Sequence, residues 1–227
     1  MTRLLRVSLV GAGLAISTPA DAQICDGSAS FGSSPVQLTA TGGFNADGHA
    51  FGGGLEVGGA GPFAGIGAGR SNYKAGGSSS EWEVEAGYQF ALNPKRTAEL
   101  CPLVSWGHSS GPHDFEAFGN GVIYDLDRNN LAIGVGIGGM AALSRHVAFL
   151  PSVSLSMLTV KSKTTNQNLS RTTNTSETSS VFELGFAFLF NDAFSARPSI
   201  LFTTGVDDKV TTFAIEMTVN LARKRSH

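Results

Sequence analysis

The sequence predicts an all-β fold, a transmembrane antiparallel up-and-down β-barrel of about ten strands, with eight strands as the alternative. Near the end of the chain, residues 182–190 and 213–221 carry large apolar residues at every second position, with small or polar residues between them except for Leu189. Strands of about 9–11 residues, apolar outward and polar inward, are what a membrane-spanning barrel requires. Charged residues make up only 15% of the chain, below the roughly one quarter usual in soluble domains.

The N-terminus has the features of an export signal. A basic start, an apolar stretch and the small-x-small site Ala20-Asp21-Ala22 predict a signal peptide over residues 1–22. The remainder is expected to comprise a periplasmic N-terminal segment, the barrel and a basic periplasmic tail. These three parts are residues 23–34, 35–222 and 223–227.

The expected strands follow one another as hairpins. The first two are rich in glycine, which is why eight strands is the alternative. In four later strands a proline lies shortly after a turn, where a missing backbone donor is tolerated; these prolines are Pro62, Pro102, Pro151 and Pro198. The ten expected strands are residues 36–44, 49–58, 62–73, 81–92, 100–108, 130–142, 146–160, 180–191, 194–204 and 210–222.

The connections between these strands alternate in length. Short turns alternate with the longer segments 74–80, 109–129 and 161–179, as in barrels with short periplasmic turns and long extracellular loops. The last of these segments is rich in Thr, Ser and Asn and is expected to be a mobile, solvated loop. The segment 109–129 is more apolar, so we expect it to pack on the rim or to extend a strand.

Together, the signal peptide, the alternating strands and the loop asymmetry resemble the family of small bacterial outer-membrane β-barrel proteins. The resemblance implies export to the periplasm of a Gram-negative-type bacterium and insertion into its outer membrane. The partners it implies are outer-membrane lipid and the barrel-assembly machinery, with an unidentified partner outside the cell. A net charge of −2 gives no basic surface for nucleic acid.

The expected function is structural or interactive at the cell surface, or that of a narrow, porin-like pore favouring cations. A soluble periplasmic β-sandwich is the alternative fold. Alternate residues of each strand point into the lumen, and we refer to these positions as the inward parity. Charged residues at these positions are expected to form a lumen charge network, since lumen residues tune selectivity. Its members are Glu56, Glu81, Glu83, Glu85, Glu183, Arg197 and Glu216. No segment has a cofactor motif or a metal-ligand spacing, so we expect neither group.

The chain has two cysteines, Cys25 and Cys101. An even count in an exported protein permits a disulfide. Cys101 has inward parity near the periplasmic end of its strand, and Cys25 precedes the first strand. A bond between them would hold the N-terminal segment across the lower mouth of the barrel, whereas two free, buried thiols are the alternative.

An outer-membrane enzyme with a rim active site near His108 is the alternative function. His108 with Ser109 or Ser110 resembles, faintly, the His-x-Ser pattern of lipid A deacylases, which implies acyl transfer. On a strand His108 shares a face with Ser110. The pair His113-Asp114, with Asp207-Asp208 on another loop, resembles omptin proteases. Polar rim residues without a catalytic role are the simpler interpretation of both patterns.

Overall fold

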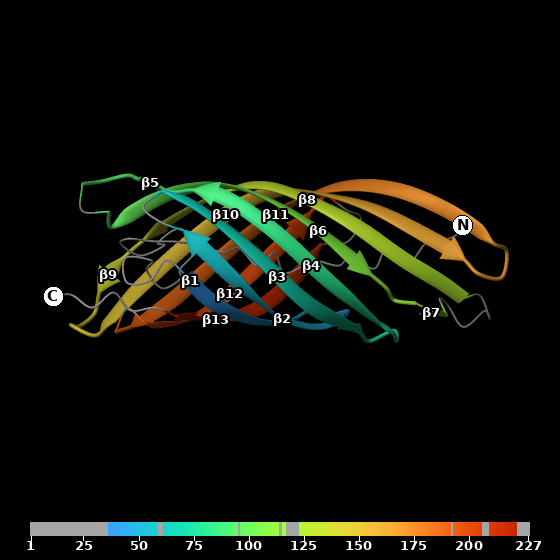
Figure 1. Ribbon diagram of the computed structural model, residues 1–227, viewed down its shortest axis with the longest axis horizontal. Helices are drawn as coiled ribbons and strands as arrows, with labels where there is room; N and C mark the ends of the chain where they lie inside the picture. The colour runs from blue at the N-terminus through green and yellow to red at the C-terminus, as the bar shows by residue number, and fades with distance from the viewer. Residues whose placement is uncertain are drawn as a thin grey trace.

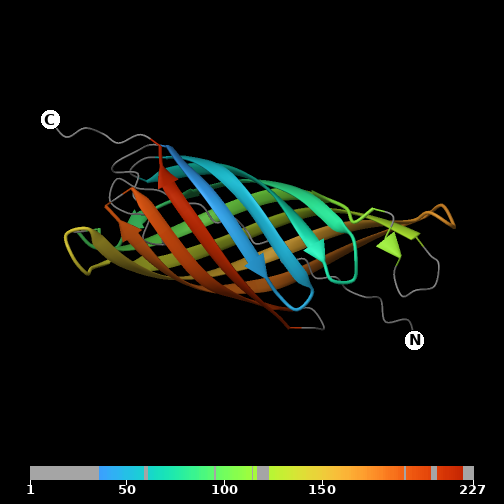
Figure 2. The same cartoon turned by 90° about the horizontal axis from the view of Figure 1, so that it is seen from below.

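The computed structural model describes residues 36–58, 61–94, 96–113, 115–116, 123–191, 193–205 and 209–221. These residues form one antiparallel sheet (Figures 1 and 2). Its ten long strands are β1 Val36–Phe44, β2 Gly48–Gly58, β3 Pro62–Tyr73, β4 Ser78–Tyr88, β6 Ala98–Ser110, β8 Ile123–Gly139, β10 Val147–Asn166, β11 Arg171–Phe190, β12 Phe194–Thr204 and β13 Val210–Asn220. Three strands of two residues each flank them: β5 Phe90–Ala91, β7 Phe115–Glu116 and β9 Ala141–Ala142.

The sheet closes on itself. The first strand, β1, pairs with the last, β13, from Gln37↔Asn220 to Phe44↔Phe213, and β6 pairs directly with β8. Each long strand therefore has a neighbour on both sides, and the barrel has ten strands. The ten-stranded prediction is confirmed. The eight-stranded barrel and the periplasmic sandwich are wrong, because a sandwich would leave sheet edges open.

Large apolar side chains cover the outside of this barrel. The outward residues of β11, for example, include Phe182, Phe186 and Phe190, each more than a third exposed. An apolar band on the outer wall is what lipid requires, because lipid offers no hydrogen bonds to side chains or backbone. No helix among the described residues is long and apolar enough to cross a membrane.

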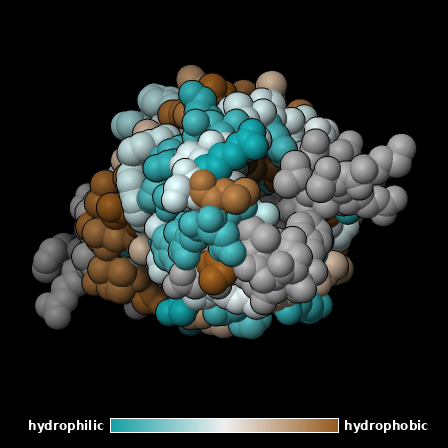
Figure 3. All heavy atoms as spheres, turned by 90° about the vertical axis from the view of Figure 1, so that its right-hand side faces the viewer, coloured by the Kyte–Doolittle hydropathy of each residue, from teal (hydrophilic) through white to brown (hydrophobic). Residues whose placement is uncertain are grey.

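The two ends of the barrel differ. Both chain ends of the sheet, Val36 and Asn220, lie at the end where β2 joins β3 and β11 joins β12 by short turns. Short turns of such barrels face the periplasm, so we term this the periplasmic end and the opposite one the extracellular end. The extracellular end, seen in Figure 3, presents mostly hydrophilic residues, with hydrophobic ones around its sides.

Three strands continue beyond the others at the extracellular end (Figure 1). The strands β10 and β11 have 20 residues each and stay paired as far as Asn166↔Arg171, while β8 pairs with β10 up to Tyr124↔Asn166. We term residues 124–129, 161–166 and 171–176 the extension. The expectation of a mobile loop over 161–179 is therefore wrong, whereas a strand extension within 109–129 is found in β8.

Candidate functional site

Side chains of the inward parity fill the middle of the lumen. All seven members of the expected charge network have this parity, and the pair at the centre is Arg197 and Glu183. The Arg197 Nη2 atom lies 3.1 Å from Glu183 Oε1, and both side chains are at most 10% exposed. Ser154 donates to Glu183 at 3.4 Å, and Arg197 donates to Ser152 at 3.5 Å.

The register of the last hairpin sets this arrangement. Arg197 on β12 lies directly opposite Glu216 on β13, so the arginine lies between this glutamate and Glu183 on β11. On its other side, a Cβ at Gly185 would lie 2.6 Å from Arg197 Nε and 2.7 Å from Ser152 Oγ. Glycine at position 185 therefore leaves room for the guanidinium to lie over β11 on the inner face of the wall. A buried charge is stable only when it is paired and hydrogen-bonded in this way.

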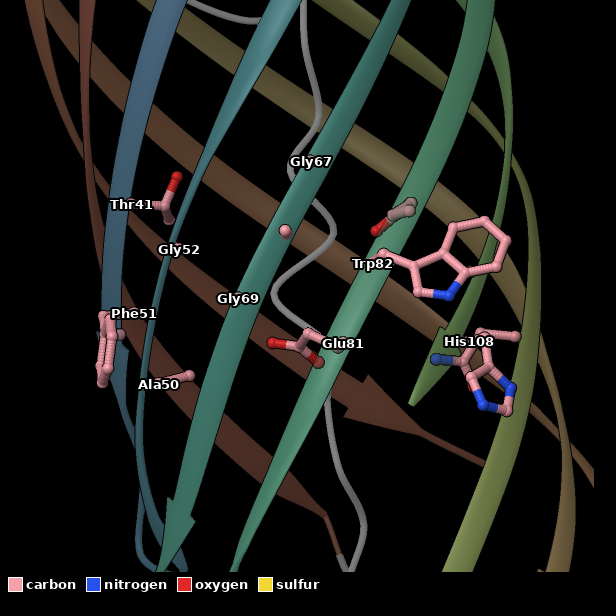
Figure 4. Close-up of a pocket in the computed structure, with 14 residues that line it drawn as sticks. Thr41, Ala50, Phe51, Gly52, Gly67, Gly69, Glu81, Trp82 and His108 are labelled. Atoms are coloured by element: carbon pink, nitrogen blue, oxygen red, sulfur yellow. The ribbon is translucent and has the colours of Figure 1, made fainter. Parts of the chain in front are cut away.

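The extracellular half of the lumen holds a cavity with a glycine wall. Gly52, Gly67 and Gly69 line it together with Glu81 and Glu83. In Figure 4 the Glu81 side chain extends from β4 towards Gly69 on β3, while Trp82 and His108 lie together on the other side of β4. Small residues on β2 and β3 thus leave space beside two carboxylates.

A second inward arginine, Arg128, lies near this cavity and was missed by the sequence reasoning. It is 4% exposed and shares one row across the sheet with Ser109 and Glu81. Its guanidinium donates to the Tyr73 hydroxyl at 3.4 Å. The sequence gives no apolar alternation before residue 130, so nothing there fixed the parity of Arg128.

The periplasmic half is packed more tightly. Gln37, Glu56 and Glu99 are 0% exposed, and so is Leu150. Glu99, also missed from the sequence, forms an ion pair with Arg96 at 3.3 Å. Solvent does not reach these side chains, which separates this half from the open cavity above it.

Cys101 belongs to the same packed half. It faces inward from β6 opposite Gly136, is 3% exposed, and does not carry a free thiol. Its expected partner, Cys25, lies outside the described residues, as do the signal peptide 1–22 and the segment 23–34. The bond between the two cysteines therefore stays a prediction.

At the extracellular rim, His108 and Ser110 contact different partners. His108 lies on the outer wall, with its ring 6.4 Å from that of Trp82, and its Nδ1 contacts Asn129 Oδ1 at 3.1 Å. Ser110 instead contacts His113, at 3.1 Å between Oγ and Nε2. The expected pairing of His108 with Ser110 stays a prediction.

The acidic residues that the structure places at the rim differ from the expected ones. Asp114, Asp207 and Asp208 lie outside the described residues. The carboxylates near Ser110 and His113 in the structure are Asp125 and Asp127, which the sequence reasoning did not select. Among the described residues, no group of three or more His, Cys, Asp or Glu side chains is arranged to hold a metal ion.

The closed barrel with an apolar exterior and a polar, charged interior defines the class of protein. The chain is an antiparallel β-barrel of the kind that spans bacterial outer membranes, and the outer membrane is its location.

Solved structures share this fold. The chain is similar to the β domain of the Bordetella autotransporter BrkA, with a TM-score of 0.50 and 12% identity over 82% of this chain and 98% of that one. It is also similar to the translocator domain of autotransporter NalP from Neisseria meningitidis, with a TM-score of 0.43 and 12% identity over 82% and 87% of the two chains. A third similar structure is that of Ail, the attachment invasion locus protein of Yersinia pestis. Its TM-score is 0.40, with 14% identity over 80% of this chain and 97% of that one.

At these identities the similarity concerns the fold alone. No protein-family model matches the chain, and no curated protein matches it either.

Proposed function

We propose that the protein acts at the cell surface, as a barrel that displays the extension to a partner outside the cell. The observation that carries this proposal is the length of the hairpin β10–β11, whose 20-residue strands are nearly twice as long as the 11-residue strands β2 and β12. The six paired rows of the extension, 161–166 with 171–176, correspond to roughly 20 Å of strand. Since the periplasmic half of the lumen is packed, a surface role is better supported than transport.

One edge of the extension offers a way to bind a polypeptide. β12 pairs with β11 from Ser180↔Thr204 onwards, so among the described residues no strand pairs with 171–176 on that side. An unpaired strand edge presents backbone donors and acceptors to an extended segment. Adding a strand to such an edge is a known mode of peptide recognition. The partner we propose is therefore an extended polypeptide segment of another surface protein.

Site-specific photocross-linking in intact cells tests this proposal. A p-benzoylphenylalanine at Asn174, on the edge strand, is expected to form an adduct with a polypeptide of defined size. The same residue placed at Asp47, in the exposed turn between β1 and β2, is the matched control and should form none. Adducts of equal yield from both positions, or none from Asn174, would contradict the proposal.

A pair of lysine substitutions then asks whether the edge itself is the binding surface. Lysines on an edge strand oppose strand addition. T173K/T175K on β11 should abolish the adduct, whereas S162K/T164K on β10 should preserve it. These four residues are direct cross-strand partners, so the two variants add equal charge on one face and differ only in the strand. Loss in both variants would argue against recognition by the edge.

The glycine-walled cavity favours a narrow cation-favouring pore as the second candidate function. Glu81 and Glu83 would attract cations to the extracellular half of the lumen. Conductance in a planar bilayer tests this, with E81Q/E83Q expected to lower the preference for K⁺ over Cl⁻ and D47N, in the exposed turn between β1 and β2, as the control. Absence of conductance steps from the wild-type barrel would exclude the pore.

We further propose that Cys25 and Cys101 form a disulfide that anchors the N-terminal segment at the periplasmic end. The burial of Cys101 supports this. Closing so long a loop would stabilise the fold by roughly 4 kcal/mol in the chain-entropy model. The wild-type protein should change its mobility on a denaturing gel when reductant is added, and C25S and C101S should not. A wild-type mobility that reductant leaves unchanged would contradict the bond.

The proposed partners during biogenesis are outer-membrane lipid and the barrel-assembly machinery. The apolar outer wall supports the first and the closed, ten-stranded sheet supports the second. Cell fractionation tests the membrane association, since the folded barrel should need detergent for extraction. A heat-dependent shift in gel mobility should accompany it.

A further inference from the structure

Three residues at the base of the extension form a chain of contacts from a hydroxyl to a carboxylate. Ser110 Oγ lies 3.1 Å from His113 Nε2, and His113 Nδ1 lies 3.5 Å from Asp125 Oδ1. The two ring nitrogens of the histidine thus face a serine on one side and an aspartate on the other. This order of groups, serine to histidine to aspartate, is the one that activates a serine nucleophile.

Separate elements hold these three groups in place. Ser110 ends β6, and Asp125 belongs to β8, on the same face as Asp127, the residue directly opposite Ser110. His113 reaches back to Ser110 because the chain turns at Gly111, whose φ of 101° is a left-handed conformation that favours glycine. A Cβ there would also lie 2.6 Å from the Ser78 carbonyl oxygen.

The aspartate is itself oriented by the tip of the hairpin β10–β11. Gln167 Nε2 donates to Asp125 Oδ2 at 2.9 Å, which leaves Oδ1 directed at His113. A histidine that acts as a base needs such a carboxylate to fix its tautomer and to stabilise its protonated form. The side chains of His113 and Asp125 are 55% and 31% exposed, so a substrate can reach them.

We propose that Ser110, His113 and Asp125 form a hydrolytic site for ester-linked acyl chains of lipids at the outer surface of the membrane. Ser110 would attack the ester carbonyl carbon while its proton passes to His113 Nε2. The carbon–oxygen bond to the alcohol then breaks, and the alcohol takes that proton. Water, deprotonated by His113, releases the fatty acid and restores the serine.

The position of the site on the outer wall indicates the class of substrate. Ser110 shares the outward face of β6 with Trp106, which lies against Trp82 at 4.8 Å between ring centroids. Aromatic residues of this kind mark the membrane interface of barrels. Four residues along a tilted strand place Ser110 about 10 Å beyond that ring, at the level of lipid headgroups. The site therefore faces lipid headgroups from the outer wall and does not open into the lumen.

Two lysines favour an anionic headgroup. Lys163 lies directly opposite Asp127, and Lys161 lies opposite Asn129, so both share the outward face with the site. Both are exposed. Their charges would attract phosphate groups and hold a lipid beside Ser110.

Asp127 competes for the serine proton. Its Oδ1 lies 3.0 Å from Ser110 Oγ, while the hydroxyl has only one hydrogen to donate. D127N removes the charge that attracts this hydrogen and leaves it for His113. We therefore expect the D127N variant to react severalfold faster than the wild type, both with a serine-directed fluorophosphonate probe and in ester hydrolysis.

The experiment uses the full barrel, refolded in detergent micelles and checked for folding by its heat-dependent gel mobility. A fluorophosphonate probe should modify Ser110, located by mass spectrometry of peptides, and the barrel should hydrolyse p-nitrophenyl butyrate. S110A and H113A should each lose both reactions, with hydrolysis falling a thousandfold or more. S109A, which removes the buried inward hydroxyl next to Ser110, is the matched control and should retain both.

Lipid vesicles complete the test of the substrate class. Fatty acid release should be faster from phosphatidylglycerol than from phosphatidylcholine vesicles, and K161Q/K163Q should raise the apparent KM for the first without changing turnover of p-nitrophenyl butyrate. A folded wild-type barrel that neither reacts with the fluorophosphonate at Ser110 nor hydrolyses the soluble ester would overturn the proposal. Hydrolysis of that ester, but of neither lipid, would overturn the lipid assignment.

Discussion

The strands β10 and β11 pass through two environments, and the two parts differ in almost everything except their backbone pairing. Within the barrel, Leu155 and Met157 point outward and Ser152, Ser154 and Ser156 point inward. In the extension, from Lys161 to Asn166, both faces are polar. Pairing nevertheless runs without interruption from Val147↔Phe190 to Asn166↔Arg171.

This comparison separates two properties that the sequence pattern combines. Alternation of apolar and polar residues reports a wall between lipid and lumen, whereas strand formation itself needs only a paired backbone and suitable residues. Threonine, frequent in the extension, is β-branched and favours strands without requiring burial. The extension is thus stabilised mainly by its ladder and its neighbours.

The largest expected difference between the two parts concerns charge. R197M should lower the free energy of unfolding by about 3–5 kcal/mol, because it leaves Glu183 buried without its arginine. K163M in the extension, the matched loss of a cation, should change it by no more than about 0.5 kcal/mol. Denaturant unfolding in lipid vesicles, followed by tryptophan fluorescence, measures both values. Equal effects of the two variants would show that charges in the lumen and in the extension contribute alike to stability.

A smaller difference is expected on the outer face of β11. F186R introduces a charge in the middle of the outward run 182–190 and should cost about 2–4 kcal/mol, as at the midplane of other barrels. T172R adds the same side chain to the outward face of the extension, where water solvates it, and should be nearly neutral. The same unfolding measurement compares them. A neutral F186R would show that Phe186 does not face lipid.

The smallest expected effect lies at the tip of the extension. Ser170 has a φ of 49°, in the left-handed region where a side chain is disfavoured and glycine is not. S170G should therefore stabilise the hairpin by up to about 1 kcal/mol. Slower amide hydrogen exchange at residues 161–166, with no change at 150–157, would be the result. Exchange that slows equally in both ranges would indicate a global effect instead.

The sequence was sufficient to predict the barrel where residues face lipid and lumen in turn. Phe186 and Arg197, for example, lie on the faces that their parity predicts, and the strands β1, β3 and β12 have the expected bounds. The extension could not be predicted in the same way, because a strand in water on both faces has no hydrophobic period. Arg128 and Asp125 were missed for this reason.

The contacts at the rim could not be predicted from the sequence, for a different physical reason. Ser110 and His113 are close because the chain turns at Gly111, and Asp125 joins them through the register of β6 with β8. Register depends also on the geometry of the turns that join the strands. Alternation fixes which face a residue occupies, but it does not fix which residues of two strands are opposite each other.

The pairing of β1 with β13 also determines when the protein can be assembled. The two strands that close the sheet come from opposite ends of the described chain, so the wall cannot be completed until residues near 220 have been delivered. Until then the intermediate carries two long, unsatisfied edges, which are prone to aggregation. The union of its first and last strands is therefore the step that removes both edges and completes the wall.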